Sequence, residues 1–496
     1  MTVSRRTQVL VIGAGSAGIS AAIAAARNGA QTMLVERAGF LGGISSTLPW
    51  LGFHDREYRQ VVKGFAHEAV TELQARNAAS EYTFDPKCSS LVSIDGHAWK
   101  CLAMEMAENA GVQVLLHTIV VDTVVSQAAD GSKRLEGVVV EHKTGREAIF
   151  ADVVIDCSGD GDVAARAGAA WEKGRTEDGL VQAPTLVFRL GGLDREKFVA
   201  ACKDPSMNYR EWIHGNPVLW EKMIKRIDTL PTFVLGGFAG LMAKAREAGD
   251  LDVPQTRVVG VKTHRPDEIT IVSTRVLGLD PTNVESLSSA YMRIYRQVPN
   301  LVAFFKKYMP GCENARLLEI APMLGVRESR RIMGDYVLTK EDLIGGRVFD
   351  DAVAMGGYHI DIHRPKGTWV ESHNVRAYTI PIRSLIARNF EGLMMAGKCI
   401  SATHEAIAGT RVIPICMAQG QAAGTAAALA VSSTISPREV SVVALQDLLQ
   451  KQGAEIGRTL GEPNQKVIDE VGQLPFEEPP TSGDEDDASK TEAAWV

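Results

Sequence analysis

The chain has 496 residues, 45% hydrophobic and 23% charged, which is the composition of a soluble globular protein large enough for more than one core. Its net charge of -7 and the lack of a long basic stripe argue against nucleic acid or an anionic membrane as a partner. The seven cysteines are scattered and form no CxxC pair, which argues against a disulfide framework or a zinc ribbon. We therefore expect a cytoplasmic protein that acts on a small molecule.

The first predicted unit follows the N-terminus. TQVLVIGAGSAGISAAIAAARNGAQTMLVERAGFLGG indicates a buried strand, a glycine turn, an alanine-rich helix and a second strand that ends at Glu36. Arg5 and Arg6 precede the apolar run as in an export signal, but the glycine spacing and the later acid explain the run better as folded structure. The pattern predicts the start of an α/β domain with a doubly wound parallel sheet.

The rest of the chain predicts one discontinuous domain with insertions. Apolar runs with turn signals at Asp130-Gly131 and Thr144-Gly145 indicate short strands that add a small antiparallel layer. A glycine-rich loop and an Ala/Gly-rich helix after residue 390 indicate that the chain returns to the first domain. We expect a first domain from 1–55, 96–168 and 368–433, a helical insertion at 56–95, an inserted α+β substrate domain at 169–367, a C-terminal helical segment at 434–473 and a disordered acidic tail at 474–496.

The glycine turn predicts a nucleotide site. GAGSAG places Gly13, Gly15 and Gly18 in the GxGxxG pattern, after a strand and at the start of a helix. Gly13 permits the tight turn, Gly15 lets the backbone approach a pyrophosphate, and Gly18 allows close helix packing, while the helix N-terminus offers free N–H groups. Glu36 ends the second strand and can accept hydrogen bonds from ribose hydroxyls.

Three motifs together resemble a flavoprotein family. The ExxxxxGG spacing from Glu36 to Gly42 and Gly43, the stretch IDCSGDGD and the stretch AGKCISATHEAIAGTRV are similar to the FAD-binding patterns of the glutathione-reductase superfamily. With GVRESRRIMGDYVLTKEDL they resemble bacterial FAD-dependent oxidoreductases related to fumarate-reductase flavoproteins. The resemblance implies non-covalent FAD held by Gly13, Gly15, Ser16, Ala17, Gly18, Glu36, Arg37, Gly42, Gly43, Gly159, Asp160, Gly397, Arg411 and Val412, with the backbone of Ile119 or Val120 near the adenine. It also implies that the helix starting near Val412 points its positive end at the flavin.

The stretch GGYHIDIH carries candidate catalytic groups. If it is a strand, His359, Asp361 and His363 share one face. A strand laid against the flavin would let one of these groups take or give the proton that accompanies hydride transfer. A plain polar face and a two-histidine, one-carboxylate metal site stay open as alternatives, although side chains at alternate positions lie too far apart for all three to bind one ion without a bend.

Two further residues are candidates. His404 precedes the flavin-contacting helix and could reach the ring or the substrate, or only bond to loop backbone. Arg327 of GVRESRR could clamp a substrate carboxylate, because a guanidinium fork matches a carboxylate. Arg330 and Arg331 could do the same, but at least two of these three arginines are better explained as ion pairs along a helix with Glu328 and solvent. The spacing of His54 does not match a covalent flavin attachment.

The expected function is an FAD-dependent oxidoreductase that transfers a hydride between flavin N5 and a small organic substrate. The substrate would be an alcohol, an amine, a saturated C–C bond or an activated alkene, and an external electron acceptor or donor would complete the cycle. The alternatives are an oxidase or monooxygenase that uses oxygen, a non-catalytic electron-transfer subunit, and a metal-dependent hydrolase with structural FAD. A homo-oligomer is compatible with the sequence, which leaves the oligomeric state open.

Overall fold

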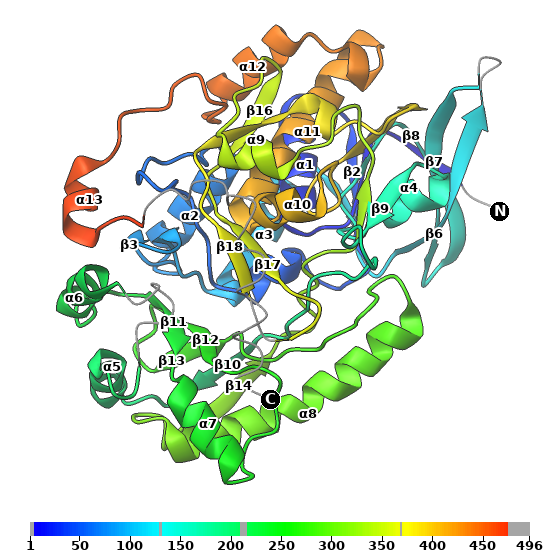
Figure 1. The fold of residues 1–496 in the computed structure, drawn as a ribbon. Helices are drawn as coiled ribbons and strands as arrows, with labels where there is room; N and C mark the ends of the chain where they lie inside the picture. The colour runs from blue at the N-terminus through cyan, green and yellow to red at the C-terminus, as the bar shows by residue number, and fades with distance from the viewer. Residues whose placement is uncertain (1–3, 128–130, 209–215, 368–369, 475–496) are drawn as a thin grey trace.

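A computed structural model of the protein describes residues 4–127, 131–208, 216–367 and 370–474 (Figure 1). The turn residue Asp130 and the predicted disordered tail, apart from Leu474, lie outside the described residues. The chain folds into two units that have separate hydrophobic cores. In Figure 1 the green unit with α5, α7 and α8 lies below the unit that holds both the first and the last strands of the chain.

An eight-stranded sheet forms the centre of the first unit. β1 (Ser4–Ile12) pairs in parallel with β2 (Thr32–Val35) and with β8 (Gly145–Asp156), and β2 pairs in parallel with β5 (Gln113–Leu115). Residues 9–12 and 32–35 are buried on both faces, which is why these strands appear as continuous apolar runs in the sequence. The mixed α/β fold with a parallel central sheet is therefore confirmed.

An antiparallel layer continues from this sheet. β6 (Ile119–Gln127), β7 (Lys133–His142) and β8 form successive antiparallel pairs. The turn between β7 and β8 uses Gly145 at a φ of 111°, a left-handed conformation that glycine adopts without strain. The short strands expected from the sequence are longer than predicted, and β8 serves both layers because it also pairs with β1.

The chain returns to this sheet near its C-terminal end. β20 (Phe390–Glu391) pairs in parallel with β7, and β21 (Leu393–Met395) pairs in parallel with β8. The long helix α11 (Ile413–Ser433) then lies along α1 (Ser16–Arg27). A Cβ on Gly420 would lie 2.0 Å from the carbonyl oxygen of Ala17, so only glycine permits this approach.

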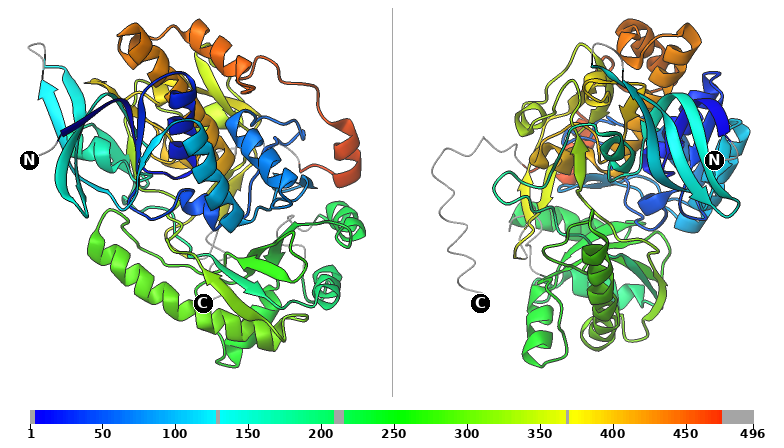
Figure 2. Two further views of the ribbon diagram at one scale, coloured as in Figure 1. Left: turned by 180° about the vertical axis from the view of Figure 1, so that it is seen from behind. Right: turned by 90° about the vertical axis from the view of Figure 1, so that its right-hand side faces the viewer.

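The second unit is an α+β domain. Its five-stranded antiparallel sheet has the order β11 (Phe233–Gly237), β12 (Val258–Lys262), β13 (Glu268–Ile271), β10 (Phe188–Gly191) and β14 (Arg316–Ile320). The helices of this unit are α5 (Arg195–Lys203), α6 (Pro217–Arg226), α7 (Ala239–Glu247) and the 25-residue α8 (Val284–Tyr308). Figure 2 shows α8 at the edge of the molecule far from α12.

Two predicted segment boundaries differ from the structure. Residues 330–363 were expected in the substrate domain, yet Ile332, Leu343 and Ile360 are buried in the core of the first unit. The apolar pattern of these residues shows that they are buried but does not indicate against which core. The segment 56–95, expected to be helical, contains one helix, α2 (Phe65–Ala75), and the hairpin β3 (Thr83–Asp85) to β4 (Ser89–Leu91).

The remaining elements complete the first unit. The predicted C-terminal amphipathic helix is α12 (Val442–Lys451), with Leu445 and Leu449 buried. The other elements are η1 (Gly43–Ser46), α3 (Gly96–Asn109), α4 (Asp162–Ala167), β9 (Trp171–Lys173), β15 (Arg330–Ile332), α9 (Lys340–Ile344), β16 (Ala352–Gly356), β17 (Ile360–His363), β18 (Val370–His373), β19 (Tyr378–Pro381), η3 (Ile382–Ser384), α10 (His404–Thr410), η4 (Pro437–Glu439) and α13 (Gln465–Val471). Among the described helices, none taken singly is long and apolar enough to cross a membrane, and one pair, α10 and α11 with a 93° bend, meets the length and composition limits together.

The contact between α1 and α11 predicts a strong effect of a small substitution. A Cβ on Gly424 would lie 2.1 Å from the carbonyl oxygen of Ala21, and backbone on both sides cannot move away cheaply. We expect Gly424→Val to lower the free energy of unfolding by about 3 kcal/mol, the upper range for overpacking a well-packed core. Urea denaturation of the purified protein measures this value.

The matched control is Gly461→Ala, where an added Cβ meets nothing within 4 Å. Its unfolding free energy should stay within about 0.5 kcal/mol of the wild type. Equal stability of the Gly424→Val and Gly461→Ala proteins would contradict the close packing of the two helices.

Candidate active site

One large cavity is lined by both units. Its volume is about 2270 Å³, well above the range of about 300–1000 Å³ for a single small-molecule pocket. The glycine turn after β1 forms one end, the β17–β18 hairpin lines the middle, and one face of the second unit's sheet closes the other side. The space is therefore large enough for a dinucleotide and a second molecule.

The glycine turn has the geometry of a dinucleotide site. Gly13 has a φ of 93°, and a Cβ there would lie 2.5 Å from the carbonyl oxygen of Cys157. A Cβ on Gly18 would lie 1.7 Å from the carbonyl oxygen of Gly13, so the helix starts directly against the turn. A Cβ on Gly15 would meet nothing within 4 Å, because Gly15 borders the cavity. The three predicted glycine roles thus have three separate structural reasons.

The acidic end of β2 closes the nucleotide end of the cavity. The carboxylate of Glu36 accepts hydrogen bonds from the backbone N–H of Ala14 at 2.6 Å and of Ala38 at 2.8 Å. Each oxygen keeps a second lone pair that can accept from a ribose hydroxyl. Arg37, Ile119 and Val120 line the same end.

Most of the predicted FAD contacts lie on the cavity wall. Gly18 and Gly42 are the exceptions, because Gly18 lies behind the turn and the N–H of Gly42 donates to the carbonyl oxygen of Ala14 at 2.9 Å. The predicted contacts that line the cavity are Gly13, Gly15, Ser16, Ala17, Glu36, Arg37, Gly43, Ile119, Val120, Gly159, Asp160, Gly397, Arg411 and Val412.

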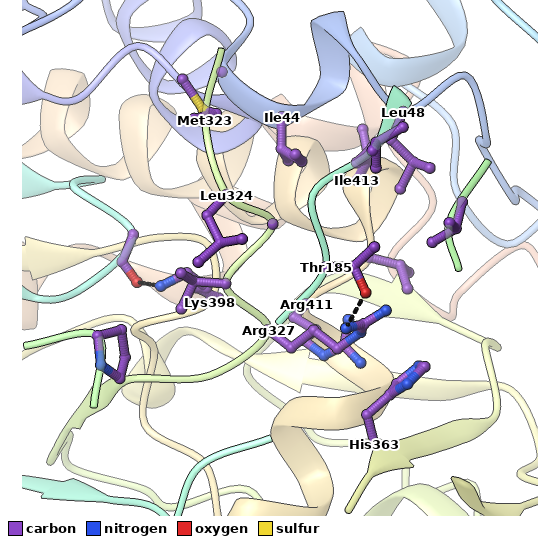
Figure 3. A pocket seen from close by; sticks show the side chains of 18 of the residues that line it. Ile44, Leu48, Thr185, Met323, Leu324, Arg327, His363, Lys398, Arg411 and Ile413 are labelled. Atoms are coloured by element: carbon purple, nitrogen blue, oxygen red, sulfur yellow. Dashed lines mark hydrogen bonds between the residues drawn. The ribbon is translucent and has the colours of Figure 1, made fainter. Parts of the chain in front are cut away.

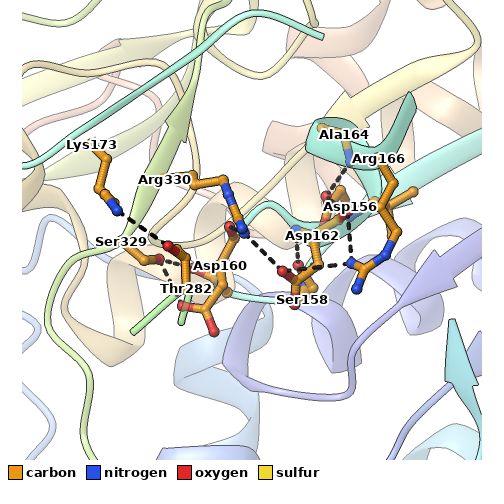
Figure 4. A network of polar contacts seen from close by, with 12 residues as sticks. Asp156, Ser158, Asp160, Asp162, Ala164, Arg166, Lys173, Thr282, Ser329 and Arg330 are labelled. Atoms are coloured by element: carbon orange, nitrogen blue, oxygen red, sulfur yellow. Dashed lines mark hydrogen bonds and ion pairs between the residues drawn. The ribbon is translucent and has the colours of Figure 1, made fainter. Parts of the chain in front are cut away.

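A lysine that the sequence analysis missed ties two cavity loops together. The ammonium group of Lys398 donates to the carbonyl oxygen of Gly159 at 2.5 Å and to the carboxylate of Asp160. Ser329 also donates to Asp160, at 2.7 Å (Figure 4). Burial alone would raise the pKa of Asp160, but the charge of Lys398 outweighs it and lowers that pKa, so the carboxylate is ionised.

The same loop is anchored from behind by a buried acid. Asp156 has no exposed surface, and its carboxylate accepts from the N–H groups of Ser158 at 2.9 Å, Val163 at 3.0 Å and Ala164 at 2.9 Å (Figure 4). These bonds fix the turn between β8 and α4. Asp156 therefore acts on the position of the loop rather than on a ligand.

The HIDIH stretch faces the cavity as the sequence predicted. β17 pairs with β18, and His359, Asp361 and His363 all line the cavity. The Nε2 atom of His363 lies 3.1 Å from a carboxylate oxygen of Asp361. Burial alone would raise the pKa of Asp361, but His363, His359 and Arg411 together hold it well below its usual value. Asp361 is therefore a carboxylate at neutral pH.

His363 is a neutral imidazole in this environment. Burial first, and then the nearby charge of Arg327, lower its pKa to about 3, although Asp361 acts in the opposite direction. Because Asp361 is ionised and His363 is neutral, the shared hydrogen belongs to Nε2 of His363. Its Nδ1 atom is then the proton acceptor.

Arg327 and Arg411 bring positive charge next to this pair (Figure 3). Arg327 donates to the carbonyl oxygen of Ala183 at 2.5 Å and to the hydroxyl of Thr185 at 2.9 Å, which are both neutral groups. Burial and then the charge of Arg411 lower the pKa of Arg327 to about 9. Arg411 itself donates to the backbone carbonyl oxygen of Asp361 at 3.0 Å, and its nearest carboxylate oxygen, on Asp361, is 3.8 Å away.

Two arginines that the sequence analysis missed extend this positive region into the second unit. Arg275 and Arg257 line the cavity, and burial and then the charge of Arg257 lower the pKa of Arg275 to about 10. Arg275 also lowers the pKa of Arg327, so the four guanidinium groups form a connected series. Arg257 directly precedes β12 and Arg275 lies in the segment after β13, both distant in sequence from the motifs, and the tertiary fold brings them to the cavity.

The structure places His404 elsewhere than expected. His404 is 8% exposed, and its Nδ1 atom lies 2.9 Å from the buried carboxylate of Glu328, which also binds Arg331. The described residues that line the cavity do not include His404, so direct contact with flavin or substrate is not supported. Glu328, whose carboxylate also accepts from the N–H of Gln182, therefore holds His404 at the start of α10.

Several alternatives have no structural support. His54 lies edge-on to Tyr82 and Phe84 and 2.8 Å from the hydroxyl of Ser90, behind the described cavity wall. Arg330 lies on the strand β15 and not on a helix as predicted, and its ion-pair partner is Asp162 at 2.8 Å. Within the described part of the chain, no group of three or more His, Cys, Asp or Glu side chains is arranged to hold a metal ion.

Residues 8–449 match the family model described as FAD dependent oxidoreductase. The chain belongs to this family. Its cofactor is therefore FAD, and the glycine turn, the open space above Gly15 and the acid at the end of β2 fit that cofactor.

A curated relative supports the same assignment over a short stretch. The probable fumarate reductase Ifc3 of Shewanella frigidimarina is 57% identical over 42 residues, which is 8% of this chain and 7% of the relative. The chain thus spans only a small part of the relative's length in this match. The match gives no information about the substrate.

Solved structures are similar at low identity. A geranylgeranyl bacteriochlorophyll reductase-like protein of Thermoplasma acidophilum has 12% identity and a TM-score of 0.42, covering 95% of this chain and 99% of its own. The p-nitrophenol 4-monooxygenase of Pseudomonas putida has 10% identity and a TM-score of 0.43, covering 94% of each chain. Because both scores are below 0.5, the family assignment rests on the sequence match.

The open space at Gly15 predicts a variant that folds but loses its cofactor. In Gly15→Val the new side chain enters the cavity where the pyrophosphate is expected, and it meets no protein atom near its Cβ. We expect FAD affinity to fall by at least about 100-fold, or about 2.8 kcal/mol. Fluorescence titration of the apoprotein with FAD measures this change.

The control Gly461→Val places the same side chain at an exposed position. It should bind FAD like the wild type. Tight FAD binding by Gly15→Val would mean that the pyrophosphate lies elsewhere.

Proposed function

We propose that the protein transfers a hydride between FAD and a small organic anion. In this proposal the first unit is a doubly wound FAD-binding domain, and the second unit, residues 186–326, binds the substrate. An external electron acceptor or donor completes the cycle. The observation that carries the proposal is the group of Arg327, Arg411, Asp361 and His363 in the cavity that also contains the FAD motifs.

The positive charge of the cavity supports an anionic substrate. Within the described part of the chain, Arg327 donates to two neutral oxygens, and the carboxylate oxygen nearest to Arg411 is 3.8 Å away. Buried guanidinium groups that repel one another are costly unless an anion balances them. A carboxylate between these two forks would accept charge-assisted hydrogen bonds from both.

The pair of Asp361 and His363 supports a proton-transfer role. Asp361 accepts the Nε2 hydrogen of His363, which fixes the ring and leaves Nδ1 as the base. In oxidation of an alcohol or amine, Nδ1 would take the O–H or N–H proton while the C–H hydride leaves with both electrons. In the reverse direction the same atom would return the proton.

Binding of the substrate anion should itself strengthen this base. The charges of Arg327 and Arg411 lower the pKa of His363 in the free protein. An anion placed between these arginines offsets part of that charge, so the pKa of His363 rises in the complex. The base thus gains basicity only after the substrate has bound.

The first helix turn of α11 supports hydride exchange at the cofactor. FAD supplies a two-electron acceptor when it is bound. Val412 and Ile413 line the cavity at the N-terminus of α11, where the helix dipole can stabilise negative charge on the cofactor by up to about 2 kcal/mol.

The proposal is tested by anaerobic addition of small alcohols, amines and acids to the FAD-loaded protein. We expect one class of organic acid to bleach the flavin absorbance near 450 nm, as a two-electron donor does. Slow recovery in air would identify a dehydrogenase, whereas rapid recovery with peroxide or an oxygenated product would identify an oxidase or monooxygenase. Failure of every compound, with FAD bound, would contradict the proposed oxidation direction.

Arg327 provides the variant that tests anion binding. For the compound that bleaches the flavin, Arg327→Ala should raise the dissociation constant by about 30-fold or more, because losing one partner of a buried charge pair costs about 2 kcal/mol or more. Arg327→Lys should recover part of the affinity. The control Arg296→Ala removes an exposed arginine of α8. Unchanged affinity in Arg327→Ala would refute the clamp.

The low pKa of His363 predicts two different pH profiles. The profile of kcat/KM reports the free protein, in which the pKa of His363 is about 3. Protonation of His363 therefore causes no fall in kcat/KM, that is, no acidic limb, above about pH 5. The profile of kcat reports the complex, in which the pKa is higher, so its acidic limb lies at higher pH. Steady-state kinetics from about pH 5 to 9 should show the acidic limb of kcat, while the limb of kcat/KM that His363 causes lies below this range.

Arg327→Gln removes a charge that lowers the pKa of His363. The free imidazole then protonates at a higher pH, and the acidic limb of kcat/KM should move upward. A limb that stays in place would argue against His363 as the base.

A further inference from the structure

The second unit's sheet gives the cavity a floor with two different rows. Val187, Val272, Val259 and Gly236 line the cavity from four neighbouring strand positions. Their neighbours pair in register, since Phe188 pairs with Ile271 and Gly236 pairs with Val259, and the N–H of Val272 donates to the carbonyl oxygen of Val259 at 2.8 Å. The four residues therefore form one apolar row across the sheet.

A polar row lies beside it, two residues along the chain from each of the three valines. Thr185, Thr274 and Arg257 line the cavity, and the period of two puts them on the same face as the valines. Thr185 accepts a hydrogen bond from Arg327. The polar row thus continues the positive group described above, while the residues of opposite parity, such as Phe188 and Ile271, are buried in the core behind the sheet.

One face of α7 lines the cavity beside β11. Ala239 and Gly240 lie on this face, and so does Ala243 about one helical turn later. A Cβ added to Gly240 would meet nothing within 4 Å, so open space lies directly above the helix. Small residues at these positions keep the part of the cavity beside α7 open, and we call this part the arm.

We propose that the substrate is an elongated amphipathic carboxylate. Its anionic group binds at Arg327 and Arg411, and its apolar body extends over the apolar row towards Gly240 of α7. The inference rests on the proposed function, because it takes the anion site from it. The arm is continuous with the arginine group, and Arg246 and Glu247 of α7 line the cavity as well. Its valine floor and the small residues of α7 offer aliphatic surface, which favours a hydrocarbon chain or ring there.

The test uses binding and needs no turnover. Straight-chain carboxylates from butanoate to dodecanoate are titrated into the FAD-loaded protein, and the flavin difference spectrum reports occupancy. Affinity should rise about fourfold for each added methylene until the arm is filled. Affinity that is independent of chain length would overturn the inference.

Gly240→Leu tests where the chain lies. The leucine should fill the arm, lower dodecanoate affinity by at least about tenfold, and leave butanoate within about twofold. Ala243→Leu is a second variant with the same expected pattern, should Gly240→Leu not fold. Ala248→Leu is the control, because it places a leucine at an exposed residue directly after α7. FAD content and thermal unfolding are compared for all variants.

The outcomes separate this inference from the proposed function. One outcome is that Arg327→Ala loses all carboxylate binding while Gly240→Leu keeps an unchanged chain-length series. This outcome would overturn the placement of the chain in the arm and leave the anion site in place. Binding of NADPH that Gly240→Leu abolishes, without chain-length dependence among carboxylates, would assign the arm to a nucleotide instead. A chain-length series in the wild type with no bleaching by any compound would retain the amphipathic site and reject the redox proposal.

Discussion

The close packing of α1 on α11 is the contact on which the rest of the structure depends. Gly420 and Gly424 let the two helices meet at backbone distance, where a Cβ would lie 2.0 or 2.1 Å from a carbonyl oxygen of α1. This contact joins the first and last parts of the first unit. It also places the glycine turn before α1 and the N-terminus of α11 on the wall of one cavity. Two helix N-termini that are far apart in sequence therefore border one cavity.

Positive charge is the second constraint. The charges of Arg411 and Arg275 add to burial in lowering the pKa of Arg327, and the charge of Arg257 does the same for Arg275. Among the described residues, the carboxylate of Asp361 lies 3.8 Å from Arg411. Such an arrangement lowers the stability of the free protein, and binding of an anion relieves it. Because the charges of Arg327 and Arg411 also lower the pKa of His363, the proposed anion binding and proton transfer would be coupled through electrostatics. The coupling requires no conformational change.

The sequence predicted those parts of the site that depend on local structure. The glycine turn, Glu36 and the side-chain alternation of the HIDIH strand follow from spacing along a strand or helix, and all are found on the cavity wall apart from Gly18 and Gly42. Gly18 acts through close packing against Gly13, and Gly42 adopts a left-handed φ of 112° that favours glycine. Family membership and FAD were also predicted and are confirmed.

The remaining parts depend on which core a segment joins, and a single sequence contains no direct signal for that. Residues 330–363 pack on the first unit although the preceding chain forms the second. For the same reason Lys398, Arg275 and Arg257 were missed, and His404 was placed at the flavin when its partner is Glu328. Each of these positions is set by contacts between residues that are far apart in sequence.

A crystal structure of the protein with FAD and octanoate tests the central claim most directly. We expect the isoalloxazine ring beside Val412, the carboxylate within hydrogen-bond distance of both Arg327 and Arg411, and the Nδ1 atom of His363 facing the space between ring and ligand. A flavin ring remote from His363, or a carboxylate bound away from the two arginines, would contradict the proposed site.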